Sequence, residues 1–112
     1  MDLQIDASKT ALVVIDLQRG IVGFPSAPHA ATDVVARAAR IADALRAVGG
    51  MVVLVHVMPS ADGKDGLKPI TDASPQARGP VPADWAGIVP ELGPRPGDTV
   101  ITKRQWGAFY GT

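Results

Sequence analysis

The chain has 112 residues, with 11 basic and 11 acidic side chains, so its formal net charge is zero. This length predicts a single domain spanning residues 1–112, and the neutral balance argues against nucleic acid or an anionic membrane as a partner. The absence of cysteine excludes a disulfide framework, a thiolate metal site and a cysteine nucleophile within these residues. An acidic start without a signal region, and no apolar run near the roughly 20 residues of a membrane span, predict a cytoplasmic α/β domain.

Residues 10–17 are predicted to form the first strand, because five apolar residues in a row indicate a strand buried on both faces of a parallel sheet. Asp16 interrupts this run, and Gln18 follows it closely. Ligands of open α/β sheets bind beyond the carboxyl ends of the strands, which makes Asp16 a candidate catalytic group. An aspartate here could equally cap the turn or helix that follows.

An irregular loop is expected over residues 20–31, followed by a helix that starts at Thr32 and Asp33, either of which offers an N-cap. Apolar residues then recur at three- and four-residue spacing, which predicts one buried stripe. The opposite face, expected to be solvated, carries Arg37, Arg40, Asp43 and Arg46. A pair of glycines at 49–50 supplies the stop.

Residues 51–58 are predicted to form a second apolar strand, interrupted only by His56. A strand, a helix and a strand with short connections form a right-handed βαβ unit, so the two strands are parallel and end at the same edge. A single histidine in such a strand is typical of a core or edge position. His29 lies in a proline-rich loop without a second ligand at metal spacing, and no phosphate-binding glycine signature is present.

The rest of the chain is predicted to be a long loop at 59–83, a short helical or turn segment at 84–92, turns at 93–98 and a third strand at 99–102. Three of the five aromatic residues then gather close to Thr112. Three strands and one long helix also leave an open sheet edge. We therefore expect the sequence to be incomplete as a folding unit.

Asp16 and Lys103 occupy matching positions, because each ends a parallel strand at the same edge of the predicted sheet. A lysine there can position a carboxylate or stabilise negative charge that develops on a substrate. The alternative for Lys103, which has Arg104 beside it, is a solvated surface lysine.

Two blocks resemble the isochorismatase-like hydrolases, also called the cysteine hydrolase superfamily. Residues 11–18 (Ala-Leu-Val-Val-Ile-Asp-Leu-Gln) are similar to that family's opening strand, and residues 90–112 are similar to its lysine block. The resemblance implies a three-layer α/β/α, Rossmann-like fold around a parallel sheet of about six strands, of which this chain would be the N-terminal part. It also implies a small-molecule substrate, no cofactor, and a homo-oligomer, either a dimer or a tetramer.

Residue by residue, the resemblance places the family's catalytic aspartate on Asp16 and its lysine on Lys103. Most members add a cysteine on a later turn, beyond this sequence; there the thiolate attacks an amide carbonyl and the aspartate moves the proton. True isochorismatases lack that cysteine and hydrolyse a vinyl ether with the aspartate as acid. Amide, carbamate-type and vinyl-ether substrates therefore all remain open.

The substrate-binding positions that we assign are Gln18, Ile21 and Trp106. Ile21 stands where the family often carries an aromatic residue, which argues against stacking on a flat ring. Trp106 is expected to be a pocket wall, with plain interface packing as its alternative. Nicotinamidase-type members build a metal site from an aspartate and paired histidines after the second strand. The corresponding loop here has no histidine, so no metal is predicted.

A second hypothesis belongs to another class of function. The same fold could serve as a non-catalytic assembly or interaction module, held together through its open sheet edge or through the terminal aromatic residues Trp106, Phe109 and Tyr110.

Overall fold

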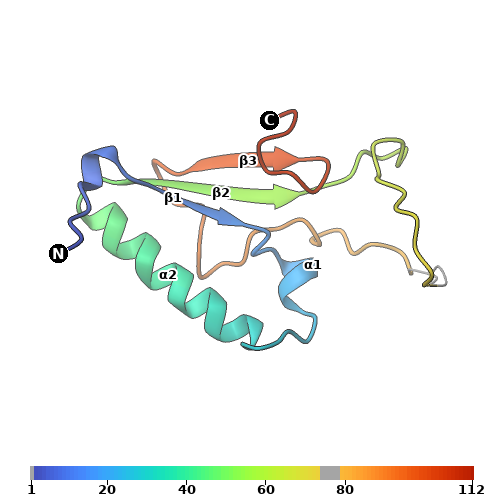
Figure 1. Ribbon diagram of the computed structural model, residues 1–112, viewed down its shortest axis with the longest axis horizontal. Helices are drawn as coiled ribbons and strands as arrows, with labels where there is room; N and C mark the ends of the chain where they lie inside the picture. The colour runs from blue at the N-terminus through green and yellow to red at the C-terminus, as the bar shows by residue number, and fades with distance from the viewer. Residues whose placement is uncertain (1, 74–78) are drawn as a thin grey trace.

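The computed structural model describes residues 2–73 and 79–112. Its three strands are all parallel and lie in the order β1-β2-β3, with β2 in the middle. This arrangement confirms the predicted α/β class and the parallel pairing of the first two strands (Figure 1). In chain order the elements are a 3-10 turn at Ala7–Lys9, β1 (Ala11–Ile15), α1 (Arg19–Val22), α2 (Ala31–Ala47), β2 (Met51–Val57) and β3 (Thr99–Lys103).

The core lies between α2 and one face of the sheet. The apolar spacing of the helix brings Val35 and Ala42 against the strands, where both are buried. The core cluster of buried residues consists of Val14, Val35, Ala42, Val52, Leu54, Val89 and Leu92. The predicted apolar stripe is wider than the buried one, since three of its members remain exposed: Val34, Ile41 and Val48.

The opposite face of the sheet carries the alternate side chains of the strands, among them Val13, Val53 and Val55. The C-terminal segment lies on this side of the sheet, whereas α2 lies on the other (Figure 1). Between that segment and the strands is an apolar hollow of about 300 Å³, lined by residues that include Ile101 and Phe109. Within the described residues, no helix covers this face.

Several element boundaries differ from the sequence-based expectations. The helix α2 begins at Ala31 with Ala30 as its N-cap, and no side chain caps it. A short helix, α1, occupies the start of the expected loop. Residues 84–92 agree with the turn alternative of their prediction: they form turns and an isolated bridge, and the backbone of this segment hydrogen-bonds to the chain that follows β1. No helix in the described part of the chain is long and apolar enough to cross a membrane.

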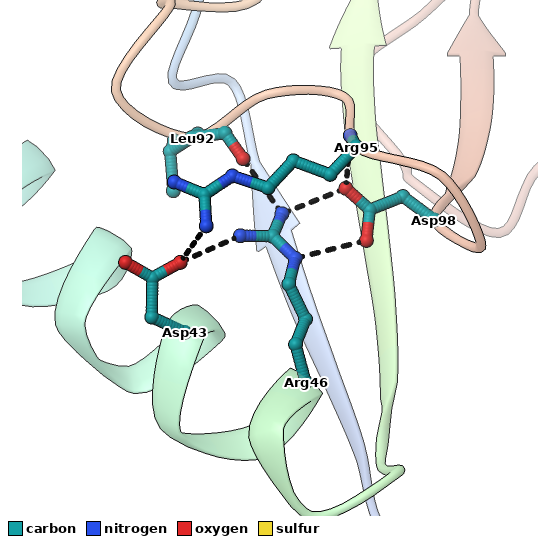
Figure 2. Close-up of polar contacts among 5 residues, drawn as sticks. All are labelled: Asp43, Arg46, Leu92, Arg95 and Asp98. Atoms are coloured by element: carbon teal, nitrogen blue, oxygen red, sulfur yellow. Dashed lines mark hydrogen bonds and ion pairs between the residues drawn. The ribbon is translucent and has the colours of Figure 1, made fainter.

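Arg46 is a further correction, because it does not lie on a solvated face. Its side chain is 15% exposed, and its guanidinium makes two hydrogen bonds to Asp98, at 3.0 and 2.7 Å. It also donates to the carbonyl of Leu92 at 2.7 Å and contacts Asp43, which pairs in turn with Arg95 (Figure 2). This ion cluster fixes the turn before β3 onto the C-terminal end of α2, at the end of the strands opposite to the predicted site.

Candidate active site

Asp16 follows β1 directly and is the one non-glycine residue with a positive φ, 65°, among the described residues. Its backbone N–H still donates to the carbonyl of Val55 at 2.9 Å, so the residue is anchored to β2. In an extended strand, side chains alternate between faces, and position 16 would share the α2 face with His56. The left-handed backbone turns the carboxylate away from that face and toward Lys103. Such conformations are uncommon for residues other than glycine, though aspartate tolerates them better than most.

Lys103 is the last residue of β3 and is only 3% exposed. Its ammonium donates to Asp16 Oδ2 at 3.1 Å and to the backbone carbonyl of Trp106 at 2.7 Å. A buried lysine with two acceptors is a fixed positive charge, in contrast to a mobile surface side chain. The structure therefore brings together the two strand-end residues that the sequence singled out.

The second carboxylate oxygen of Asp16 has an unusual environment. Oδ1 is buried and has no hydrogen-bond partner among the described residues, although the side chain as a whole is 34% exposed. Buried polar atoms are normally paired, so an acceptor left free next to a fixed ammonium is a feature that calls for an explanation. A carboxylate with one oxygen held by lysine and the other free can accept a proton from a reacting group and return it.

The three predicted substrate-binding residues have different environments. Gln18 is fully buried, and its amide is hydrogen-bonded to backbone atoms of Val57 and Trp85. Ile21 is half-buried in α1. The side chain of Trp106 is 71% exposed, and it is the backbone carbonyl of this residue that reaches Lys103.

His56 agrees with its interpretation as a core or edge histidine. Its Nδ1 lies 2.6 Å from the carbonyl of Ala86, which can only accept, so Nδ1 carries the proton. Its Nε2 lies 2.7 Å from the hydroxyl of Thr102, a group that can either donate or accept. Both ring nitrogens are thus used in joining β2, β3 and the segment around Ala86.

The sequence predicted a helical or turn segment at 84–92 but not that residues 84–89, which we call the strap, pair with the chain after β1. The backbone of the strap pairs with the chain after β1: Arg19 N–H donates to Gly87 O at 2.8 Å, and Gly20 N–H donates to Trp85 O at 2.9 Å. The indole of Trp85 lies so close to Gly20 that a Cβ there would be 1.9 Å from a ring carbon. Gly20 was the one available signal, because a glycine can mark a close approach of this kind.

Potential metal ligands do not gather in the described part of the chain, which contains no group of three or more histidine, aspartate or glutamate side chains placed to share an ion. The loop after β2 uses its acids locally: Asp62 and Asp65 accept hydrogen bonds from Ser60, and Asp62 also accepts one from the backbone N–H of Lys64. These bonds hold the pKa of both carboxyls below the usual range.

The aspartate–lysine pair lies beyond the carboxyl ends of parallel strands, which is where open α/β sheets bind their ligands. The Isochorismatase domain matches residues 10–112, nearly the whole sequence. The chain belongs to the isochorismatase family.

Similar proteins agree with this membership. The chain is 49% identical over 111 residues to the isochorismatase family protein YwoC of Bacillus subtilis, and 48% identical over 110 residues to YecD of Escherichia coli O157:H7. Both alignments cover 98% of this chain but only 56% and 58% of the relatives. The chain therefore spans a little over half the length of the curated relatives it matches.

Solved structures show the same relationship. An isochorismatase family protein from Burkholderia thailandensis superposes with a TM-score of 0.81 and 43% identity, covering 96% of this chain and 55% of that protein. The N-carbamoylsarcosine amidase of Thermoplasma acidophilum superposes with a TM-score of 0.65 and 24% identity, covering 90% of this chain and 55% of the amidase. The second likeness shows a shared fold.

Proposed function

We propose that the protein is a hydrolase that acts on a small molecule, cleaving either an amide- or carbamate-type C–N bond or a vinyl ether. Asp16 transfers the proton, and Lys103 is its electrostatic partner. The observation that supports this proposal is the contact of 3.1 Å between a buried ammonium and a carboxylate whose second oxygen is buried and free. Membership of the isochorismatase family supports the proposal, because both residues lie within the matched range 10–112.

The two reactions use this pair differently. In C–N cleavage, water ends as a hydroxyl on the carbonyl carbon and a proton on the leaving nitrogen, and Asp16 carries that proton. If C–N cleavage proceeds through a covalent intermediate, it also needs a nucleophilic side chain, and the 112 residues contain no cysteine. In vinyl-ether cleavage, Asp16 in its acid form protonates the substrate, and water adds as the C–O bond breaks. In either case Lys103 orients the carboxyl group and stabilises negative charge nearby.

The test is Asp16→Asn in the full protein, assayed against a panel of small amides, carbamates and vinyl ethers that first identifies a turned-over substrate. Asparagine keeps the shape of the side chain and tolerates a left-handed backbone, so the fold is retained. We expect turnover to disappear while the variant still folds and unfolds in one cooperative transition. The matched control is Asp33→Asn at an exposed helix position, which leaves turnover unchanged. Full activity in Asp16→Asn contradicts the proposal.

A second function, assembly without catalysis, is favoured by the exposed aromatic residues near the end of the chain. Trp106, Phe109 and Tyr110 are 71%, 84% and 70% exposed. Phe109 lines the hollow on the sheet face that no helix covers in the described residues. Apolar surface of this kind favours association, either as a dimer or tetramer of this chain or with another protein. Sedimentation of a stable, compact monomer across the micromolar range contradicts this second function.

A further inference from the structure

The backbone hydrogen bonds between β1 and β2 end at Asp16, but the ladder of hydrogen bonds on β2 continues for one further step. In this parallel pair, Met51 N–H donates to Thr10 O, and the alternation runs regularly up to Asp16 N–H, which donates to Val55 O. The next two bonds of such a ladder would join Val57 N–H to Asp16 O and Gln18 N–H to Val57 O. Neither of these backbone bonds is formed.

The side chain of Gln18 supplies both bonds instead. Its Oε1 accepts from the N–H of Val57 at 2.7 Å, and its Nε2 donates to the carbonyl of Val57 at 3.0 Å. A carboxamide has the same donor and acceptor groups as a peptide unit, and here it occupies the place of one. The side chain is completely buried, so water cannot substitute for it.

The backbone after Asp16, which no longer pairs with β2, pairs with the strap. Val89 N–H donates to Leu17 O at 3.2 Å, and Arg19 N–H donates to Gly87 O at 2.8 Å. The chain after β1 is therefore held on one side by the strap and on the other by its own glutamine side chain. The remaining N–H of Gln18 Nε2 reaches Trp85 O at 3.3 Å, which ties the two sides together.

We propose that Gln18 is a positioning residue for Asp16: its carboxamide stands in for a strand peptide, and this releases Asp16 from the ladder so that the carboxylate faces Lys103. With Val57 N–H already paired, the carbonyl of Asp16 has no place in the ladder, and the residue takes its left-handed conformation. Without the carboxamide, Val57 N–H is free to recapture the carbonyl of Asp16. The backbone then becomes extended, and the carboxylate turns toward the α2 face.

The inference rests on the proposed role of Asp16, but its test does not need turnover. Double-mutant cycles with Asp16→Asn and Lys103→Met are measured by urea unfolding of the full protein, once with Gln18 present and once with Gln18→Met. Methionine keeps the length and volume of the side chain and removes the amide. We expect a favourable coupling between Asp16 and Lys103 in the first cycle and its loss in the second.

The matched control is Gln105→Met, because Gln105 is two residues from Lys103 and its amide, among the described residues, bonds to a loop carbonyl, that of Asp65 at 3.1 Å. The coupling persists in that background. If Gln18 had only a structural role, Gln18→Met would lower stability and leave the coupling intact, which overturns the inference. In the active protein, the same variant lowers kcat with little change in KM. If the coupling between Asp16 and Lys103 persists in Gln18→Met, the positioning role is refuted. If the coupling is lost as expected but the full protein shows no detectable turnover, only the hydrolase proposal is refuted.

A measurement on the unaltered chain covers the case in which Gln18→Met does not fold. The carboxamide protons of Gln18 exchange slowly with solvent if the amide occupies the ladder, while those of exposed Gln4 exchange fast. Resonances of both side chains are followed by NMR after transfer into D₂O. Fast exchange at Gln18 overturns the inference.

Discussion

Among the ion pairs that join distant parts of this chain, Arg46–Asp98 and Lys103–Asp16 differ in how completely their hydrogen bonds are satisfied. At one edge of the sheet, Arg46 and Asp98 are bound in a bidentate arrangement, and both oxygens of Asp98 are occupied (Figure 2). At the other edge, Lys103 holds one oxygen of Asp16 and leaves the other buried without a partner among the described residues. The first pair sits on ordinary backbone, and the second involves a left-handed aspartate.

This difference supports a structural role for the Arg46–Asp98 pair and the chemical role that we propose for Asp16 and Lys103. A charge pair whose hydrogen bonds are all satisfied has nothing left to offer a ligand, and its removal acts on stability. A pair with an unused buried acceptor and a strained backbone has been kept at a cost in stability, as functional sites commonly are. The two pairs should therefore respond in opposite ways to equivalent substitutions.

Arg46→Met is expected to have the largest effect on stability. It leaves the Asp98 carboxylate, whose side chain is 2% exposed, without its main partner. Breaking a buried pair in this way costs about 3–5 kcal/mol of unfolding free energy. Urea unfolding measures the loss, with the exposed Arg40→Met on the same helix as control. Activity per folded molecule stays unchanged, and a specific loss of activity would contradict the structural role.

Lys103→Met is expected to lower activity strongly and stability less. Turnover falls about 10²–10³-fold, the usual result of removing one group that stabilises charge in a transition state. The unfolding free energy changes less than in Arg46→Met, because the Asp16 carboxylate is 34% exposed and water can reach it. Steady-state kinetics of the full protein and urea unfolding test both parts, with the exposed Lys9→Met as control. A large stability loss with normal kinetics contradicts the assignment.

Gly20→Ala tests whether the stability of the chain around Asp16 depends on its close packing against the strap. The added methyl group would lie 1.9 Å from a carbon of the Trp85 indole, so the ring and the strap must move. Overpacking of this kind costs about 1–3 kcal/mol. Thermal unfolding measures the loss, with Gly79→Ala, where nothing lies within 4 Å of the added carbon, as control. Equal stability of the two variants contradicts the close packing.

Acid should lower the free energy of unfolding through the Arg46–Asp98 pair, by less than the substitutions above. The hydrogen bond from Arg46 holds the pKa of the Asp98 carboxyl below its usual range in the folded protein. The stability that the carboxylate contributes is therefore complete above the ordinary aspartate pKa of about 3.9 and is lost as the pH falls below it through the folded value. Unfolding of Asp98→Asn should show a weaker pH dependence below about pH 5 than the unaltered chain. Identical pH profiles contradict this linkage.

The sequence predicted those parts of the molecule that depend on local patterns. Apolar runs located the first two strands and a short β-branched run the third, and their parallel order predicted that Asp16 and Lys103 lie at the same end of the sheet. Arg46 was assigned wrongly, because helical periodicity gives the direction of a side chain but not the presence of a turn 52 residues later that covers it. The roles of Trp85 and Gln18 depend on backbone pairing between distant segments, which no single-sequence pattern records.

The ion cluster at Arg46 also bears on how the site comes together during folding. The contact between Lys103 and Asp16 closes a loop across 87 positions of the chain, and the contact between Arg46 and Asp98 closes one across 52. Because closing a longer loop costs more conformational entropy, the shorter closure is the easier first step. Once Asp98 is fixed on α2, only β3 itself separates the captured turn from Lys103. The Arg46–Asp98 pair, far from the candidate site, thus shortens the search for the contact between Asp16 and Lys103.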